Sequence, residues 1–191
     1  MIDRSADFHA LPEDLPVPED DGSARDLLGA PIPALALDAS SGNRVELAQA
    51  AENGVLVVYV YPQTGVPGQV LPEGWDLIPG ARGCTPQSCA FRDRAAELAG
   101  LGATVFGLSA QDLDQQQEFA EREQIPFPLL NDSEFRLTEE LGLPTFMAAE
   151  RRYYKRLTFI AQHGRIVKVF YPVFPPQDNA GEVVGWLRDR A

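Results

Sequence analysis

The sequence predicts an α/β sandwich in which a central mixed β-sheet is flanked by helices and preceded by an N-terminal β-hairpin. The first observation is the segment Val55–Tyr61 (VLVVYVY), which is apolar, β-branched or aromatic throughout and indicates a strand buried on both faces. The second is that strand and helix patterns alternate from this segment to about residue 141. The third is a pair of β patterns on either side of His163 and Gly164, followed by a C-terminal helix pattern.

The other elements follow from turn residues and apolar spacing. Pro33–Asp38 and Arg44–Leu47 flank a turn and predict the opening hairpin. Pro86–Leu98 predicts a helix, because its apolar residues recur at helical spacing. The proline of LGLPTF (141–146) is expected to follow a trans bond. The later elements are a strand at Thr104–Ser109, a helix at Asp112–Glu123, a strand at Phe127–Leu130, a helix at Glu134–Leu141, a hairpin of Arg156–Ala161 and Arg165–Tyr171, and a helix at Asn179–Arg190.

Composition limits the classes of partner. The 191 residues include 28 acidic and 16 basic side chains, so the formal net charge of −12 would repel phosphate backbones and anionic membranes. We therefore expect neither a nucleic acid nor a membrane as partner. The longest purely apolar run, Val55–Tyr61, is too short to span a bilayer, and the N-terminus does not resemble a signal peptide. A cytoplasmic location is expected.

The first part of the chain differs in composition from the rest. Residues 1–26 are rich in proline, aspartate and glutamate and show no apolar periodicity, so they predict an extended acidic arm that lies on the surface or is disordered. Residues 27–191 are long enough for one domain.

Both cysteines lie in one segment, GARGCTPQSCAFRD (80–93). Cys84 follows a buried strand and a loop and is expected just before a helix, with Thr85 as N-cap and Pro86 as the first helical residue. Free backbone N–H groups and the positive end of the helix dipole would then favour the nucleophilic thiolate. The alternative, that Cys84 is a small buried hydrophobe, stays open at this point.

The spacing of Cys84 and Cys89 decides whether the two cysteines can form a disulfide within a helix. In an intact helix, residues five apart have Cα atoms about 8–9 Å apart, beyond the reach of a disulfide. The two cysteines can pair only if this turn of the helix unwinds. This is typical of a transient disulfide with a catalytic role rather than of a structural disulfide. Zinc is disfavoured because the spacing is unusual for it and His9 and His163 are remote in sequence. A cysteine-based phosphatase is excluded, since the position that would need its arginine is Ala90.

Three blocks together resemble a known family. These are the YP of residues 61–62 after the buried strand, GCTPQSCAFRD (83–93) and RLTFIAQHGRIVKVF (156–170). In this order they are similar to the peroxiredoxins, and most similar to the Q type, also called bacterioferritin comigratory protein. The resemblance runs from about Leu35 to Leu187. It implies a thioredoxin-like fold and thiol-dependent reduction of hydrogen peroxide and organic hydroperoxides, without metal, flavin or haem.

The resemblance also implies roles for single residues. Cys84 would be the peroxidatic cysteine, which becomes a sulfenic acid, and Cys89 the resolving cysteine, which condenses with it to a disulfide. Arg156 would stabilise the thiolate and orient the peroxide, and Pro62 would shield the sulfur from water. From its residues alone, the RRYYKR segment around Arg156 could instead be a solvated charged turn.

The chain departs from the family pattern before Cys84. The position that usually carries a threonine or serine is Ala81, and the segment between Pro62 and Gly83 is lengthened. Thr64 could fold back to supply the missing hydroxyl. Trp75, Leu77 and Ile78 could form a lid that narrows access to the site, or the segment could be a surface loop pinned by Trp75.

The sequence therefore predicts an atypical two-cysteine peroxidase, monomeric or a weak homodimer, that thioredoxin or a glutaredoxin-like dithiol reduces. The alternatives are a redox-sensing disulfide protein without turnover and a thiol–disulfide oxidoreductase, although the latter usually has a C-x-x-C pair.

Overall fold

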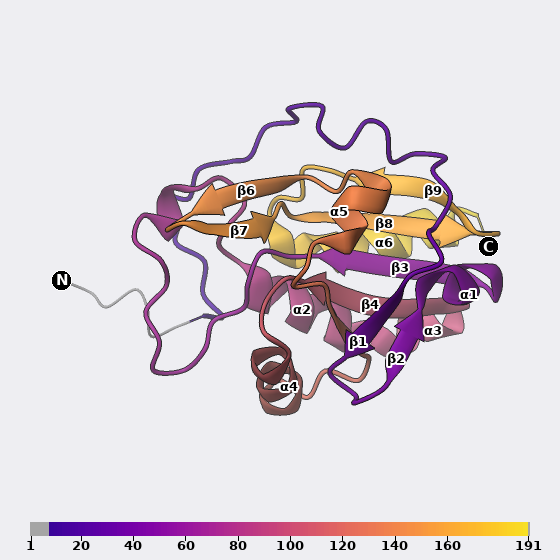
Figure 1. Ribbon diagram of the computed structural model, residues 1–191, viewed down its shortest axis with the longest axis horizontal. Helices are drawn as coiled ribbons and strands as arrows, with labels where there is room; N and C mark the ends of the chain where they lie inside the picture. Colours follow the sequence, from indigo (N-terminus) through magenta and orange to yellow (C-terminus); the bar gives the residue numbers. More distant parts are fainter. Residues whose placement is uncertain (1–7, 191) are drawn as a thin grey trace.

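The computed structural model describes residues 8–190, which form a seven-stranded sheet with the order β2-β1-β5-β4-β3-β8-β9 (Figure 1). A separate hairpin of β6 and β7 stands beside it. The strands are β1 (Ala36–Ala39), β2 (Arg44–Glu46), β3 (Val55–Val60), β4 (Ala103–Ser109), β5 (Leu129–Asn131), β6 (Thr145–Ala148), β7 (Arg151–Tyr154), β8 (Leu157–Gln162) and β9 (Arg165–Phe170). The helices are α1 (Leu47–Glu52), α2 (Cys84–Asp93), α3 (Ala95–Gly100), α4 (Leu113–Arg122), α5 (Arg136–Leu141) and α6 (Asn179–Arg188), with short 3₁₀ turns at Trp75–Leu77 and Pro176–Asp178.

The sheet is mixed, as expected. Strand β3 pairs in parallel with β4 and antiparallel with β8, and β4 continues in parallel with β5. The β1–β2 and β8–β9 hairpins complete the two edges in antiparallel pairing. Strand β3 therefore lies inside the sheet, which agrees with its apolar sequence.

Helices cover both faces of this sheet (Figure 1). On one face, alternate residues of β3 (Leu56, Val58, Val60) pack with residues of α1 and α5. On the other face, Val57 and Tyr59 pack with residues of α2, α3, α4 and α6. Burial of a strand on both faces is what an α/β sandwich requires.

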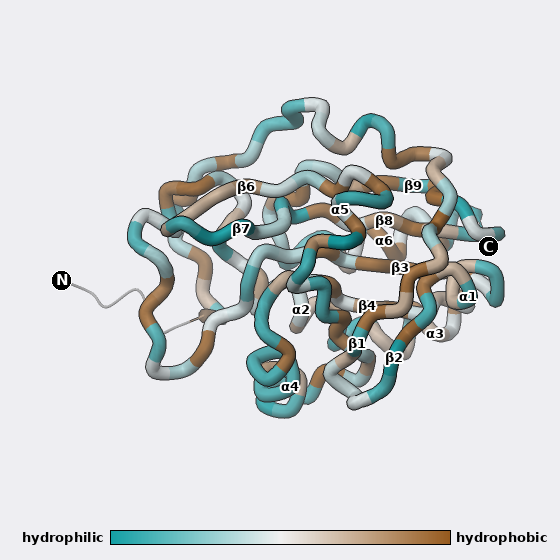
Figure 2. Tube along the Cα trace, viewed as in Figure 1, coloured by the Kyte–Doolittle hydropathy of each residue, from teal (hydrophilic) through white to brown (hydrophobic). Residues whose placement is uncertain are grey.

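Helix α4 shows how such a helix is fixed. Figure 2 shows that the helix is mostly hydrophilic, whereas the side chain of its residue Phe119 is fully buried against the sheet. A single apolar face of this kind places a helix on the surface of the core.

The structure corrects several predicted boundaries. The helix expected at Pro86–Leu98 begins earlier, at Cys84, and is interrupted at Arg94 between α2 and α3. Helix α1 was not predicted, because Leu47 was assigned to the preceding strand. The β6–β7 hairpin was also not predicted, and its second strand contains residues 151–154 of the RRYYKR segment that could have been a charged turn. The bond before Pro144 is trans as expected, whereas Pro172 and Pro175 follow cis bonds.

The described part of the N-terminal arm runs along the surface of the domain and has no helix or strand before Pro31. Asp21 pairs with Lys155 and accepts a hydrogen bond from the Tyr171 hydroxyl at 2.8 Å. Pro31 forms a β-bridge with Arg165 at the edge strand β9. Within residues 8–190, no helix combines the length and the apolarity needed to cross a membrane.

Candidate active site

Cys84 is the first residue of α2, at the end of the long loop that follows β3. Its N-cap is Gly83, with a φ of 101°, so the prediction that Thr85 caps the helix was wrong by two residues. A Cβ at residue 83 would lie 2.4 Å from Cγ of Pro176, and a glycine is therefore required where the chain passes this proline. The sulfur still lies in the first turn, where backbone N–H groups are free to stabilise an anion.

Arg156 reaches this sulfur from the opposite side of the loop. Its Nη2 lies 3.1 Å from Cys84 Sγ and donates a hydrogen bond to it. The same guanidinium donates to the carbonyl oxygens of Gly80 at 3.2 Å, Ala81 at 3.3 Å and Arg82 at 3.0 Å. These bonds fix a cation beside the sulfur, within hydrogen-bond distance of any negative charge that forms there.

A buried polar network holds Arg156 in place, and sequence reasoning missed it. Arg156 Nη1 donates to Gln87 Oε1, Gln87 Nε2 donates to Asn179 Oδ1 at 3.0 Å, and Thr158 Oγ1 donates to the same Asn179 oxygen at 2.6 Å. All four side chains are buried. Gln87 could have been predicted as a site residue, because it lies one helical turn after Cys84. Asn179 could not, because it is 95 residues away from Cys84 in the sequence and only the fold brings it to the site.

Cys84 is only 2% exposed, and a small cavity of about 10 Å³ reaches it. A cavity needs about this much space to hold one water molecule. The cavity is bordered by the arm, by the lengthened loop and by the start of α2; its lining residues are Phe8, Gln63, Gly65, Leu71, Trp75, Arg82, Gly83, Cys84 and Thr85. Among them Thr85 carries the one hydroxyl, while the methyl group of Ala81 lies buried nearby in the loop.

Thr64 does not line this cavity. Its hydroxyl donates to Gln111 Oε1 at 2.9 Å, and its backbone N–H donates to the same oxygen at 3.0 Å. Pro62 is buried directly after β3, where its carbonyl accepts a hydrogen bond from the Ser109 hydroxyl at 3.1 Å. The structure thus brings Cys84 and Arg156 together, while the suggested roles of Thr64 and Pro62 stay predictions.

The lengthened loop is anchored by Trp75. Trp75 is 2% exposed, and its indole packs edge-on against Tyr153 of β7, with ring centroids 4.9 Å apart. Leu77 is 80% exposed and does not pack over the site, so its expected part in a lid was wrong. Trp75 lines the cavity at Cys84 and also anchors the loop. It therefore has features of both predicted alternatives, a lid over the site and a surface loop fixed by Trp75.

Cys89 lies on α2, and both thiols are free in this structure. Its Sγ donates to Glu123 Oε2 at 3.6 Å. Burial raises the pKa of the Cys89 thiol to about 11, and the Glu123 carboxylate adds to this increase. Potential ligand atoms of His9, Cys89 and Glu123 lie within 4.8 Å of one another, but the carboxylate is paired with Arg92 and Arg122, which favours a hydrogen-bonded cluster over a metal site.

The chain is similar to proteins of known family and fold. A family model described as redoxin matches residues 27–184. The chain belongs to the redoxin family. Among relatives, chloroplastic peroxiredoxin Q of Oryza sativa subsp. japonica is 29% identical over 161 residues, which cover 84% of this chain and 66% of that protein, just under two thirds of its length. Peroxiredoxin Bcp of Escherichia coli (strain K12) is 27% identical over 162 residues, which cover 83% of this chain and 94% of that protein.

Solved structures of similar fold include peroxidoxin BcpB of Mycobacterium tuberculosis, with a TM-score of 0.70 and 24% identity over 86% of this redoxin and 97% of that chain. Peroxiredoxin Q of Xanthomonas campestris has a TM-score of 0.65 and 23% identity over 83% of this chain and 94% of its own. The thioredoxin-like fold is therefore confirmed. The resemblance to Q-type peroxiredoxins is confirmed by the curated relatives. The redox-sensing alternative is not favoured.

Proposed function

We propose that this redoxin is a thiol-dependent peroxidase that reduces hydrogen peroxide and organic hydroperoxides, that Cys84 is its peroxidatic cysteine and that Arg156 activates it. The observation that carries the proposal is the 3.1 Å contact between Arg156 Nη2 and Cys84 Sγ in the first turn of α2. The thiolate attacks one oxygen of the hydroperoxide, the S–O bond forms and the O–O bond breaks. Cys84 becomes a sulfenic acid, and the second oxygen leaves as water or an alcohol after it takes up a proton.

Arg156 has two tasks in this step. Its Nη2 donates a hydrogen bond to the sulfur that attacks the peroxide, and its remaining bonds to the carbonyls of residues 80–82 fix the orientation of the guanidinium. Stabilisation of the departing oxygen is assigned to the free N–H groups of the first helical turn and to the hydroxyl of Thr85, a residue that lines the cavity. We assign Thr85, rather than a group at Ala81, to this part of the site.

We further propose that Cys89 resolves the sulfenic acid by forming a disulfide with Cys84. Both cysteines lie within the unbroken helix α2, so this helix has to unwind at its first turn before the two sulfurs can meet. A dithiol protein then reduces the disulfide. The family implies a thioredoxin-like reductant, and we propose that this reductant is thioredoxin itself or a glutaredoxin-like protein. We also propose that the protein is a monomer or a weak homodimer located in the cytoplasm. Residues 1–26 are then an appendage to the domain.

Replacing Cys89 by serine tests the resolving role. Because the peroxide reacts with Cys84, the Cys89→Ser variant is expected to consume one equivalent of hydrogen peroxide per chain at an undiminished rate. It is expected to lose thioredoxin-driven cycling almost completely, since no internal disulfide can form. Peroxide consumption and NADPH oxidation in a coupled thioredoxin assay measure the two effects. Cycling at the rate of the unmodified chain would show that Cys89 takes no part.

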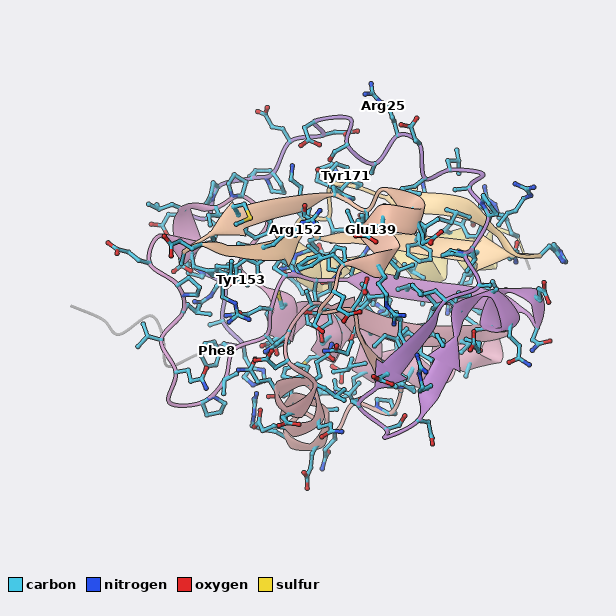
Figure 3. All side chains as sticks on the ribbon, in the orientation of Figure 1. Phe8, Arg25, Glu139, Arg152, Tyr153 and Tyr171 are labelled. Atoms are coloured by element: carbon cyan, nitrogen blue, oxygen red, sulfur yellow. The ribbon has the colours of Figure 1, made fainter. Side chains whose placement is uncertain are left out.

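Access to Cys84 also suggests a test. The Phe8 ring lies against Gly65, where an added Cβ would be only 2.1 Å from it, and the Arg82 guanidinium lies over the ring at 5.9 Å. Figure 3 labels Phe8 beside the lengthened loop. Together with Trp75, Phe8 leaves room beside the sulfur for little more than a water-sized molecule. We propose that this opening favours small hydroperoxides.

Phe8→Ala is therefore expected to raise the rate with cumene hydroperoxide relative to hydrogen peroxide by at least about threefold. The ratio of the two kcat/KM values is the measurement, because it cancels any general loss of active protein. Val17→Ala, which shortens an exposed apolar side chain of the same arm, is the control and should leave the ratio unchanged. An unchanged ratio in Phe8→Ala would show that the arm does not limit access.

A further inference from the structure

The peroxide-reducing step does not use the buried cluster around Cys89. Cys89 Sγ on α2 donates to Oε2 of Glu123, the residue that follows α4. Glu123 is 7% exposed, although it carries a carboxylate. A carboxylate buried to this degree is stable only when other groups pair with it, so its surroundings define what it can do.

The partners of Glu123 come from three parts of the chain. Arg122 of α4 pairs with Oε1, and Arg92 of α2 lies 3.7 Å from Oε2 and donates to the backbone carbonyl of Glu123 at 2.8 Å. His9 of the N-terminal arm has its Nε2 3.4 Å from Oε1. The carboxylate is thereby fixed, and its contact with Cys89 ties the middle of α2 to the end of α4.

The charges around Cys89 keep its thiol protonated. Burial raises its pKa most, Glu123 and Asp93 raise it further, and Arg92 opposes them. Arg122 and His9 pair with the same carboxylate, and a ring nitrogen of His9 also lies within 4.8 Å of Cys89 Sγ. A protonated thiol is a poor nucleophile, so Cys89 is unreactive as long as it stays in this cluster.

Disulfide formation has to break the contact with Glu123. The two sulfurs cannot meet within an intact helix, and unwinding of α2 removes Cys89 from the carboxylate. In solvent the thiol regains its ordinary reactivity. The contact therefore opposes the opening of the helix by the free energy of one buried hydrogen bond to a charged acceptor.

We propose that Glu123 is a positioning residue that holds Cys89 within α2 as a neutral thiol until Cys84 has been oxidised, and so sets the rate of disulfide formation. This inference rests on the proposed function, in which Cys89 resolves the sulfenic acid. In that step Cys89 Sγ bonds to the Cys84 sulfur while the S–O bond of the sulfenic acid breaks. The oxygen leaves as water with the thiol proton of Cys89, and both sulfurs end as a disulfide.

Glu123→Gln tests the proposal, because it keeps the size and an acceptor oxygen and removes the charge. After a single equivalent of hydrogen peroxide, the Cys84–Cys89 disulfide should form at least about threefold faster than in the unmodified chain. At excess peroxide, less Cys84 should advance to the sulfinic acid. Glu121→Gln makes the same change at an exposed position of α4 and should alter neither quantity. An unchanged rate would overturn the proposal, and so would a slower one, which would make Glu123 a base instead.

A second measurement needs no peroxide and separates this inference from the proposed function. In a Cys84→Ser background, alkylation of Cys89 by iodoacetamide is followed against pH. Glu123→Gln should shift the profile to lower pH, because the negative charge is lost while Arg92 remains. Glu123→Asp retains the charge and should keep the profile near that of the unmodified residue. An unshifted profile in Glu123→Gln would contradict the inference, whereas a missing Cys84–Cys89 disulfide in the unmodified chain would contradict the proposed function.

Discussion

Replacing Cys84 by serine is expected to lower kcat/KM for hydrogen peroxide by at least about a thousandfold, because a serine hydroxyl is not ionised at neutral pH and does not attack the O–O bond. The Arg156 guanidinium and the helix N-terminus would remain in place but would have no anion to stabilise. Peroxide consumption by the reduced protein, followed with a peroxide-sensitive dye, measures the loss.

Two comparisons make this result interpretable. The thermal unfolding midpoint of Cys84→Ser should stay close to that of the unmodified chain, since the substitution is nearly isosteric. Cys89→Ser, which removes the other thiol, should still consume one equivalent of peroxide. A Cys84→Ser variant that retains a tenth or more of the original rate would require a different nucleophile.

Replacing Arg156 by methionine is expected to produce the second largest effect. The substitution keeps much of the side-chain volume but removes the donor that lies 3.1 Å from the sulfur and the bonds to the loop carbonyls. Loss of one such donor costs about 10²–10³ in rate in other enzymes, and a decrease of this size in kcat/KM is expected here. Single-turnover mixing with hydrogen peroxide measures it without interference from the reductant.

The charge and the geometry of Arg156 can be separated. Arg156→Lys restores a cation but cannot reproduce the planar fork that binds the sulfur, Gln87 and the loop together, so it should recover only part of the lost rate. Arg152→Met removes an exposed arginine from the same RRYYKR segment and should leave the rate unchanged. Equal losses in Arg152→Met and Arg156→Met would indicate a general effect of charge rather than the contact with Cys84.

Much of the fold could be predicted from local patterns. Val55–Tyr61 is apolar on both faces, and β3 occupies the interior of the sheet, because only a strand covered on both sides tolerates such a sequence. Helix α1 and the β6–β7 hairpin were missed, and both are short. Leu47 of α1 was assigned to the preceding strand, while Tyr153 of β7 packs against Trp75, a contact between distant residues that local preference does not show.

Some residues of the candidate site could likewise be predicted from the sequence, and others could not. Cys84, Cys89 and Arg156 were predicted, because the first two share one segment and the third lies in a motif with a specific resemblance. Gln87 and Asn179 were not, since a buried network depends on distances between α2 and α6 that a sequence does not contain. The same holds for Glu123 and His9, which meet Cys89 only because the arm and the end of α4 come together beside α2.

The most direct test of the central claim identifies the atom that first receives oxygen from the peroxide. The reduced Cys89→Ser variant is mixed with one equivalent of hydrogen peroxide, quenched within milliseconds, and its peptides are weighed. We expect the added oxygen on Cys84 alone, and in the unmodified chain a disulfide that joins Cys84 to Cys89. Peroxide consumption that leaves the Cys84 peptide unchanged in mass would contradict the account.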